Sequence, residues 1–195
     1  MKPKDIIIAT AVILIISSLL GGCNSKSNNN VSLNKAQKAN ILAMVKKAEM
    51  AKKEVNMVFA SEKSEGKVKV TISLNNPNKK PITSVESWLS FDPKKLEGLE
   101  INTSKSAFKL TAPYKNTFNN KKGLVMLGRA GPKPIIDQKI HMAVVTFNVL
   151  AGRSITLDSY DYREDLTGHT SANIHIEGKP YNVLTKPASP ALVIK

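Results

Sequence analysis

The feature that most constrains the fold of this chain is a strict alternation of apolar and polar side chains in short segments after residue 55. It is clearest in "GKVKVTISLNN", residues 66–76, where every second position from residue 68 to residue 74 is apolar. The apolar positions are Val68, Val70, Ile72 and Leu74. Successive side chains of a β-strand point to opposite faces. The segment therefore predicts a strand with one buried face and one solvated face.

Comparable segments continue along the chain and are separated by polar turns. They are "EVNMVFA" (54–60), "SVESWLSF" (84–91), "GLVMLGRA" (123–130), "HMAVVTFNVL" (141–150), "SITLDSYDY" (154–162), "ANIHIEG" (172–178) and "ALVIK" (191–195). About eight or nine short strands with no second helix predict an all-β domain over residues 55–195, folded as an antiparallel two-sheet sandwich. A chain of 195 residues has room for one such core.

The N-terminus has the pattern of an export signal. Lys2 and Lys4 precede an apolar run over residues 6–20, which is short for a membrane-spanning helix of roughly 20 residues and suits a signal peptide. The run ends in "LLGGC", which resembles the bacterial lipobox, so we expect residues 1–22 to be removed and Cys23 to be acylated. The alternative is an uncleaved signal anchor with an incidental thiol. Both predict an exported protein held at the outer face of the bacterial cell membrane.

Cys23 is the only cysteine, so no intramolecular disulfide forms. Residues 23–31 include the polar stretch "NSKSNNN", which predicts a disordered spacer after the acylated cysteine. Residues 32–54 predict a basic helix with Ser32 as N-cap. Its apolar face is formed by Ile41, Leu42, Val45 and Ala48. This helix lies on the membrane or docks a partner in one interpretation; in the other it is a stalk or packs on the domain.

The net charge of +14 favours anionic partners, such as lipid headgroups, acidic wall polymers or polysaccharides. The lysines are spread along the chain, and no aromatic-basic stacking motif or groove-reading helix is recognisable. We therefore expect no nucleic-acid partner.

The only tryptophan lies on the polar face of the segment 84–91. In a strand, Ser84, Glu86 and Trp88 share one face, whereas Val85 and Leu89 point the other way. A tryptophan beside a carboxylate has the character of an interface anchor. Alternatively, the predicted helix or the loop "TAPYKNTFNNKK" (111–122) covers it.

The order of these segments resembles a cohesin domain over residues 55–195. The resemblance rests on the turn aromatic-Asp-Pro-x-x-Leu at residues 91–96, and on an apolar-Thr-Phe-x-Val strand at residues 145–149 that runs into a small-Gly turn. It implies a jelly-roll sandwich, related to carbohydrate-binding modules, that binds calcium-loaded dockerin modules or another envelope protein. In that family the outer face of the sheet carrying the Asp-Pro strand forms much of the contact. The resemblance thus implies that Ser84, Glu86 and Trp88 form the partner-binding face.

Two other functions remain open. Tyr160 and Tyr162 are two residues apart and, with Trp88, would form an aromatic platform for a cell-wall or extracellular polysaccharide. In the third interpretation, the domain is a passive structural component of an envelope assembly and the helix makes the contacts.

The sequence indicates neither catalysis nor a cofactor. It contains no G-x-S-x-G, H-E-x-x-H, phosphate-loop or C-x-x-C motif. Asp158, Asp161 and Asp165 are a weak calcium candidate, because their spacing is not that of an EF-hand and Arg163 lies between them. The three histidines have no ligand-spaced partners, so no zinc site is expected. We expect a protein that is not an enzyme.

Overall fold

The structure is a computed structural model that describes residues 34–151, 156–163 and 169–187 of the chain. Contacts within the chain divide it into two compact units, residues 1–39 and 40–195. Both sheets lie in the second unit. Several predicted features lie outside the described residues: the signal peptide, Cys23, the spacer, Ser32 and the strand 191–195.

One helix, α2 (Lys35–Ala51), lies within the span predicted to be helical. Its N-cap is Asn34, whose Oδ1 accepts from the backbone N–H of Gln37 at 2.8 Å, while Gln37 Oε1 accepts from the N–H of Asn34 at 2.9 Å. Each side chain thus satisfies an otherwise unpaired backbone N–H of the first turn. Among the described residues, no helix has both the length and the apolar character needed to cross a bilayer.

The end of α2 belongs to the second unit and packs against the sandwich. Met50 and Ala51 contact the core, and the ammonium of Lys80 donates to the carbonyls of Glu49 and Met50 at 2.8 and 2.9 Å. The four large apolar side chains of the middle turns are exposed. These are Ile41, Leu42, Met44 and Val45.

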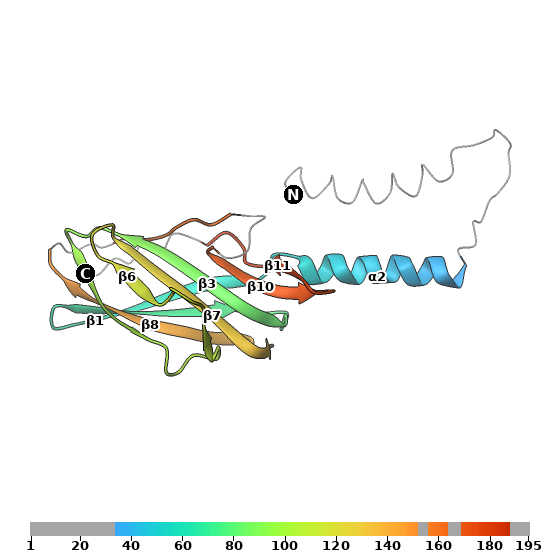
Figure 1. The fold of residues 1–195 in the computed structure, drawn as a ribbon, viewed down its shortest axis with the longest axis horizontal. Coiled ribbons are helices and arrows are strands. Elements are labelled where there is room, and N and C mark those ends of the chain that lie inside the picture. Colours follow the sequence, from blue (N-terminus) through green and yellow to red (C-terminus); the bar gives the residue numbers. More distant parts are fainter. Residues whose placement is uncertain (1–33, 152–155, 164–168, 188–195) are drawn as a thin grey trace, which may run out of the picture. The chain divides into compact units, whose positions relative to one another are not determined.

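In the described part of the chain, eleven strands form two antiparallel sheets (Figure 1). The four-stranded sheet has the order β1-β2-β8-β4, and the larger sheet has the order β11-β10-β3-β7-β5, with β6 also on β7 and β9 also on β3. Their bounds are β1 Asn56–Ser64, β2 Lys67–Asn75, β3 Ile82–Phe91, β4 Leu96–Asn102, β5 Leu110–Thr111, β6 Thr117–Asn119, β7 Leu124–Ile135, β8 Lys139–Val149, β9 Leu157–Ser159, β10 Ser171–Ile176 and β11 Lys179–Asn182. This confirms the predicted all-β, two-sheet antiparallel sandwich.

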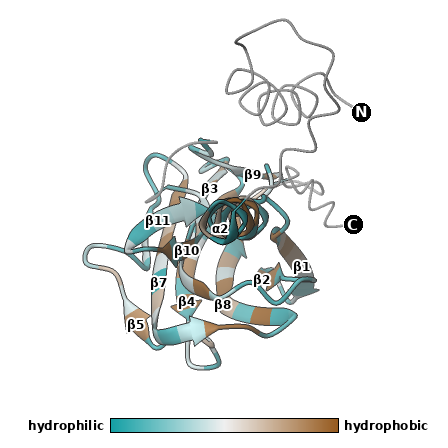
Figure 2. Ribbon diagram, turned by 90° about the vertical axis from the view of Figure 1, so that its right-hand side faces the viewer, coloured by the Kyte–Doolittle hydropathy of each residue, from teal (hydrophilic) through white to brown (hydrophobic). Residues whose placement is uncertain are grey.

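The core lies between the inner faces of the two sheets, as the alternating pattern predicts (Figure 2). All four apolar side chains of β2 are buried, and β3 buries Val85 and Leu89 on the face opposite Trp88. Phe147 of β8 meets Phe91 and Phe118 edge-on, with ring centres 5.2 and 5.8 Å apart. Such edge-to-face pairs add to the free energy gained by burial.

The turn after β3 has the form expected from the Asp-Pro motif. The carbonyl of Asp92 accepts from the N–H groups of Lys95 and Leu96 at 3.0 Å, and Leu96 returns to the core with 1% of its surface exposed. Pro93 has no N–H and cannot continue the ladder. The chain therefore leaves the larger sheet here and enters β4 of the smaller one.

Strand β8 departs from simple alternation. Ala143, Val145 and Phe147 of β8 are fully buried as predicted, but Val149 is only half-buried at the end of the strand. The pairing of β2 with β8 shifts between Ile72 and Ser73, and this bulge turns Met142 toward the core as well.

Candidate functional site

The predicted site residues lie on the outer face of β3, in the middle of the larger sheet. Ser84, Glu86 and Trp88 are half-buried there and alternate with buried inner residues. Across the ladder, Glu86 is opposite Gly128 of β7 and Trp88 is opposite Met126. Ser84 lies at the margin, where its hydroxyl accepts from the side-chain amide of Asn173 at 3.2 Å.

Glu86 and Trp88 form a cluster with Lys115. The indole Nε1 of Trp88 donates to Oε2 of Glu86 at 3.1 Å. The ammonium of Lys115 lies 3.1 Å from the same oxygen and 4.0 Å from the centre of the indole ring. The side chains of Lys115 and Glu86 are only 19% and 16% exposed, so the ion pair is partly shielded from water. Shielding strengthens both the ion pair and the cation–π contact.

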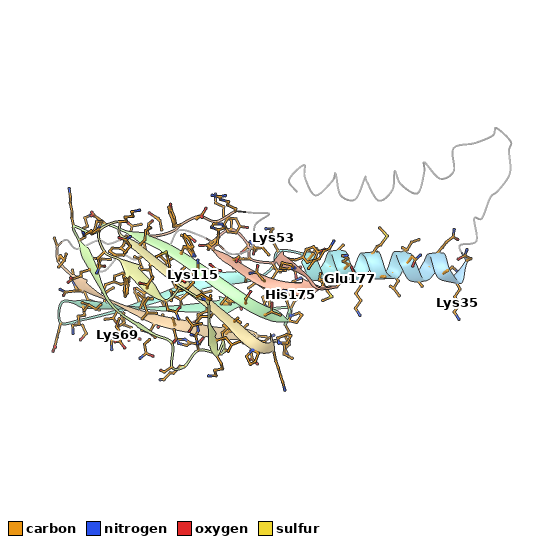
Figure 3. The ribbon with its side chains drawn as sticks, viewed as in Figure 1. Lys35, Lys53, Lys69, Lys115, His175 and Glu177 are labelled. Atoms are coloured by element: carbon orange, nitrogen blue, oxygen red, sulfur yellow. The ribbon has the colours of Figure 1, made fainter. Side chains whose placement is uncertain are left out.

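Lys115 reaches this place because the loop between β5 and β6, which both pair with β7, lies over Gly128 of that strand (Figure 3). We call residues 112–116 the crossing loop. It is held by hydrogen bonds from the N–H of Ala112 to the carbonyl of Gly128 at 3.0 Å and from the N–H of Asn116 to the carbonyl of Met126 at 2.7 Å. A Cβ at Gly128 would lie 2.7 Å from Cγ of Lys115, so glycine is what allows the close approach.

A second group of side chains flanks Trp88. The Tyr160 ring is nearly parallel to the indole, at 10° and 6.4 Å between centres, and the His169 ring lies 5.5 Å away. The hydroxyl of Thr170 fixes this arrangement by accepting from the N–H of Trp88 at 3.0 Å and donating to the carbonyl of Tyr160 at 2.7 Å. The imidazole of His169 pairs with the carboxylate of Asp161.

Trp88 is therefore half-buried rather than openly displayed. Of the two covers that the sequence suggested, the loop 111–122 is the one that lies on it, through Lys115. Two tyrosine side chains are exposed: Tyr160, which stacks on Trp88, and Tyr114, which precedes Lys115 in the chain. Tyr114, at the tip of the crossing loop with φ 58°, is 96% exposed, and Tyr160 is 44% exposed. Neither Tyr114 nor Lys115 was predicted from the sequence, where the only local signal is a proline followed by an aromatic residue in a polar loop.

Tyr160 and Tyr162 do not form one row with Trp88. Asp161, between them, has φ 53°, which breaks the alternation of a strand. Tyr160 consequently stacks on Trp88, whereas the hydroxyl of Tyr162 donates to the carbonyl of Leu184 at 3.1 Å and its ring packs against the core.

The structure offers no support for the calcium alternative. Asp158 is exposed, and the carboxylate of Asp161 is occupied by Arg163, at 2.9 Å, and by His169. Asp165 lies outside the described residues. Within residues 34–151, 156–163 and 169–187, no group of three or more His, Cys, Asp or Glu side chains could hold a metal ion.

The other two histidines lie apart from this cluster. His175 is exposed, on the face of β10 opposite Ile174 and Ile176. His141 is on the other sheet, where burial, and then the positive charge of Lys105, lower its pKa.

The chain is similar to known cohesin domains in sequence and in fold. The model of the cohesin domain family matches residues 53–171. Among solved structures, the third ScaC cohesin of Acetivibrio cellulolyticus, solved in complex with the ScaB dockerin, is 18% identical with a TM-score of 0.51, and the match covers 68% of this chain and 100% of that one. The seventh ScaB type I cohesin of Pseudobacteroides cellulosolvens is 24% identical with a TM-score of 0.49, over 69% and 87% of the two chains.

A cohesin module from a family 33 glycoside hydrolase of Clostridium perfringens is 11% identical with a TM-score of 0.47, over 67% and 90% of the two chains. No curated protein matches the chain.

Proposed function

This chain belongs to the cohesin domain family, and we propose that its sandwich binds another protein through the outer face of the larger sheet. The partner is a dockerin-like module or another envelope protein. The observation that carries the proposal is the cluster of Glu86, Trp88 and Lys115, with Tyr114 and Tyr160 displayed beside it. Aromatic residues are enriched among residues that dominate binding energy, especially where polar partners hold them rigidly.

Several features support this use of the surface. The ion pair of Glu86 and Lys115 is already formed in the free protein, so binding does not need to order two long side chains. Tyr114 presents almost its whole surface at the tip of the crossing loop. In the solved complex of the third ScaC cohesin, the bound module is a dockerin. The protein has no catalytic role in this proposal.

The sugar-binding alternative keeps one observation in its favour, the nearly parallel rings of Trp88 and Tyr160. Two rings form a shorter stacking surface than the three expected from the sequence. The alternative predicts that a neutral polysaccharide, and no protein, is retained by this face.

We also propose that the protein is exported and anchored to the outer face of the cell membrane through acylated Cys23. Support comes from Lys2 and Lys4, the apolar run over residues 6–20, and the "LLGGC" sequence that ends it. Growth of the bacterium with an alkyne-tagged palmitate should label the parent chain, and Cys23→Ser should abolish the label. Labelling that persists in Cys23→Ser would contradict the proposal.

The binding proposal is tested by retention of proteins from the organism's own envelope and secreted fractions. The bait is the whole 195-residue chain in mild detergent. Its variants are Tyr114→Ala, which removes an exposed side chain, Glu86→Gln and, as control, Val58→Ala on the other sheet. We expect one protein to be retained by the parent and the control and to be lost with Tyr114→Ala and Glu86→Gln.

Calcium and chelator distinguish the kinds of partner. Loss of the retained protein with chelator indicates a dockerin-like, calcium-loaded module, and retention indicates another envelope protein. Equal retention by all four chains would contradict recognition through this face.

A further inference from the structure

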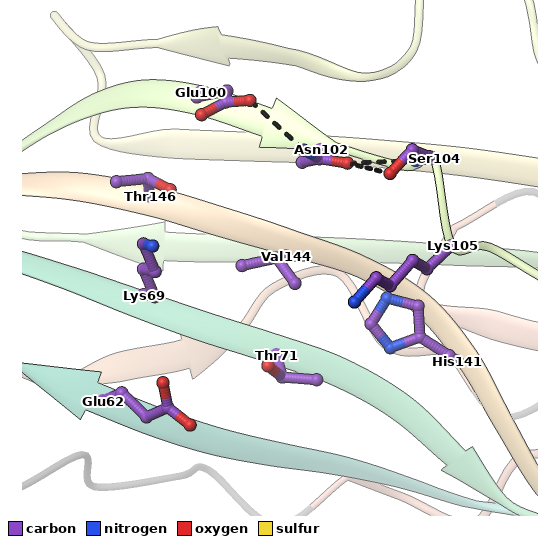
Figure 4. Close-up of a pocket in the computed structure, with 10 residues that line it drawn as sticks. All are labelled: Glu62, Lys69, Thr71, Glu100, Asn102, Ser104, Lys105, His141, Val144 and Thr146. Carbon is purple, nitrogen blue, oxygen red and sulfur yellow. Dashed lines mark hydrogen bonds between the residues drawn. The ribbon is translucent and has the colours of Figure 1, made fainter.

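The outer face of the smaller sheet is hollowed, on the side of the sandwich away from Trp88 (Figure 4). A first hollow of about 260 Å³ and a second of about 440 Å³ adjoin each other, because four residues line both. The shared residues are Glu62, Lys69, Glu100 and Thr146. We call the two hollows together the trough.

The register of the sheet explains the trough. The four shared residues form one row across the strands, because Glu62 pairs with Lys69, Lys69 with Thr146, and Thr146 with Glu100. In the next row Thr71 of β2 is opposite Val144 of β8. The side chains of Thr71 and Val144 are short and form the floor of the first hollow. Longer side chains stand on either side of this floor (Figure 4).

Lysine side chains supply positive charge at the first hollow. Lys105 extends over it with its ammonium beside the ring of His141 (Figure 4). The turn that places Lys105 is fixed by Asn102, whose Oδ1 accepts from the N–H of Ser104 at 3.0 Å and from its hydroxyl at 2.7 Å. Within the described residues, neither Lys69 nor Lys105 has a carboxylate at ion-pair distance.

The lowered pKa of His141 agrees with a positive charge of Lys105 that no nearby carboxylate neutralises among the described residues. Burial is the main cause of its lowered pKa, and the charge of Lys105 lowers it further. No described acidic group raises it. Lys69 and Lys105 lie at opposite ends of the first hollow (Figure 4). An anionic group placed at either end would therefore meet an ammonium group that has no ion-pair partner among the described residues.

We propose that the trough binds an acidic polysaccharide, with one carboxylate of the polymer at Lys69, another at Lys105, and its hydroxyls at Glu62, Glu100 and Asn102. Lysine is a donor and carboxylates are acceptors, so this mixture suits a ligand that carries both acid groups and hydroxyls. A simple polyanion would meet repulsion from both glutamates.

The dimensions favour a polymer over a free sugar acid. The volume of the first hollow equals that of about eight or nine water molecules at ~30 Å³ each, which is enough for one sugar ring. The second continues past Lys67 and Lys63, which offer further cations to following units of the chain. Among the described residues, no phenylalanine, tyrosine or tryptophan lines either hollow, so each unit binds weakly and affinity depends on several units acting together.

The test uses the whole 195-residue chain and soluble polygalacturonate as probe, with affinity measured by titration calorimetry. The double variant Lys69→Gln/Lys105→Gln should bind at least ~10-fold more weakly than the parent. Lys121→Gln/Lys133→Gln removes the same charge from two exposed lysines outside the trough and should bind within ~2-fold of the parent. Tyr114→Ala should also bind normally, because this proposal is independent of the protein-binding face.

Three outcomes would overturn the proposal. Equal weakening by both double variants would mean that the polymer is attracted only by the overall net charge of +14. Binding of fully methyl-esterified polygalacturonate with the same affinity would show that the acid groups do not contribute. Binding of polyphosphate with the same affinity, at the same concentration of charge, would show that the hydroxyls do not contribute.

Discussion

The ammonium of Lys115 lies 4.0 Å from the centre of the indole ring of Trp88, although the two residues belong to different elements of the chain. The same ammonium is 3.1 Å from Oε2 of Glu86, which also accepts from the indole N–H. One cation thus covers the only tryptophan and neutralises the carboxylate beside it. The three side chains form a unit that is assembled before any partner binds.

Lys115→Met keeps the length of the side chain and removes its charge. The partly shielded carboxylate of Glu86 then has no cation, and we expect a loss of ~1–2 kcal/mol in the free energy of unfolding. The change is measured by urea unfolding followed through the fluorescence of Trp88. Lys121→Met, at an exposed position, should cost less than ~0.5 kcal/mol.

The coupling between Lys115 and Glu86 can be isolated in a double-mutant cycle. Lys115→Met and Glu86→Gln together should cost ~1 kcal/mol less than the sum of the single changes, because each single change breaks the same ion pair. Additive effects would show that the ion pair contributes nothing to stability.

Gly128→Ala should displace the crossing loop. Its new Cβ would lie 2.7 Å from Cγ of Lys115 and 3.0 Å from Cβ of Ala112, so the loop must move away from the sheet. Such overpacking costs ~1–3 kcal/mol. We expect red-shifted emission of Trp88 as water reaches the ring. Emission and stability identical to the parent would mean that the loop does not rest on this glycine.

The strands with regular alternation could be predicted from the sequence because a period of two is a local property. The inner face of β2 and the outward direction of Trp88 and Glu86 follow from that period alone. β4 was missed because the bulge between Gly98 and Glu100 lets Leu96 and Ile101, which are five positions apart, both face the core. The pattern of one face is lost there.

The neighbours of Trp88 could not be predicted because they depend on tertiary structure. Lys115 reaches the ring only because β5 and β6 both pair with β7 and the intervening loop crosses Gly128. Tyr160 and Tyr162 were expected on one face, and the left-handed conformation of Asp161 separates them. That conformation is uncommon for a residue other than glycine, and the alternating sequence gives no sign of it.

Lys80→Met should loosen the end of α2. The Lys80 ammonium is bound by the carbonyls of Glu49 and Met50 and lies 3.4 Å from Oε2 of Glu54. The Glu49 carbonyl keeps a hydrogen bond from the N–H of Lys52 at 3.3 Å, but both carbonyls lose the donor that Lys80 supplies, so we expect a loss of ~1–3 kcal/mol in the free energy of unfolding. Hydrogen exchange should accelerate at the amides of the last helical turn. Lys79→Met, next to it and exposed, is the control; equal exchange in both variants would contradict this role.

The last prediction concerns acid stability and the carboxylate of Glu54. Its pKa is lowered, first by the hydrogen bond from the side-chain amide of Asn78 at 2.7 Å and also by the charge of Lys80, against an opposing effect of burial. A carboxyl whose pKa is lower in the folded state stabilises the fold fully above its unfolded pKa of about 4.5, and this stabilisation is lost as the pH falls through the folded value.

Urea unfolding at several values between about pH 6 and about pH 3 should therefore show a smaller loss of stability for Glu54→Gln than for the parent. Glutamine keeps an oxygen that can accept from Asn78, so the difference isolates the charge. Asn78→Ala should also reduce the slope, because it removes the largest cause of the lowered pKa. A parallel loss of stability in the parent and in Glu54→Gln would contradict this prediction. It would mean that the Glu54 carboxyl has the same pKa in the folded and unfolded states, so that its contact with Lys80 does not make the fold sensitive to acid.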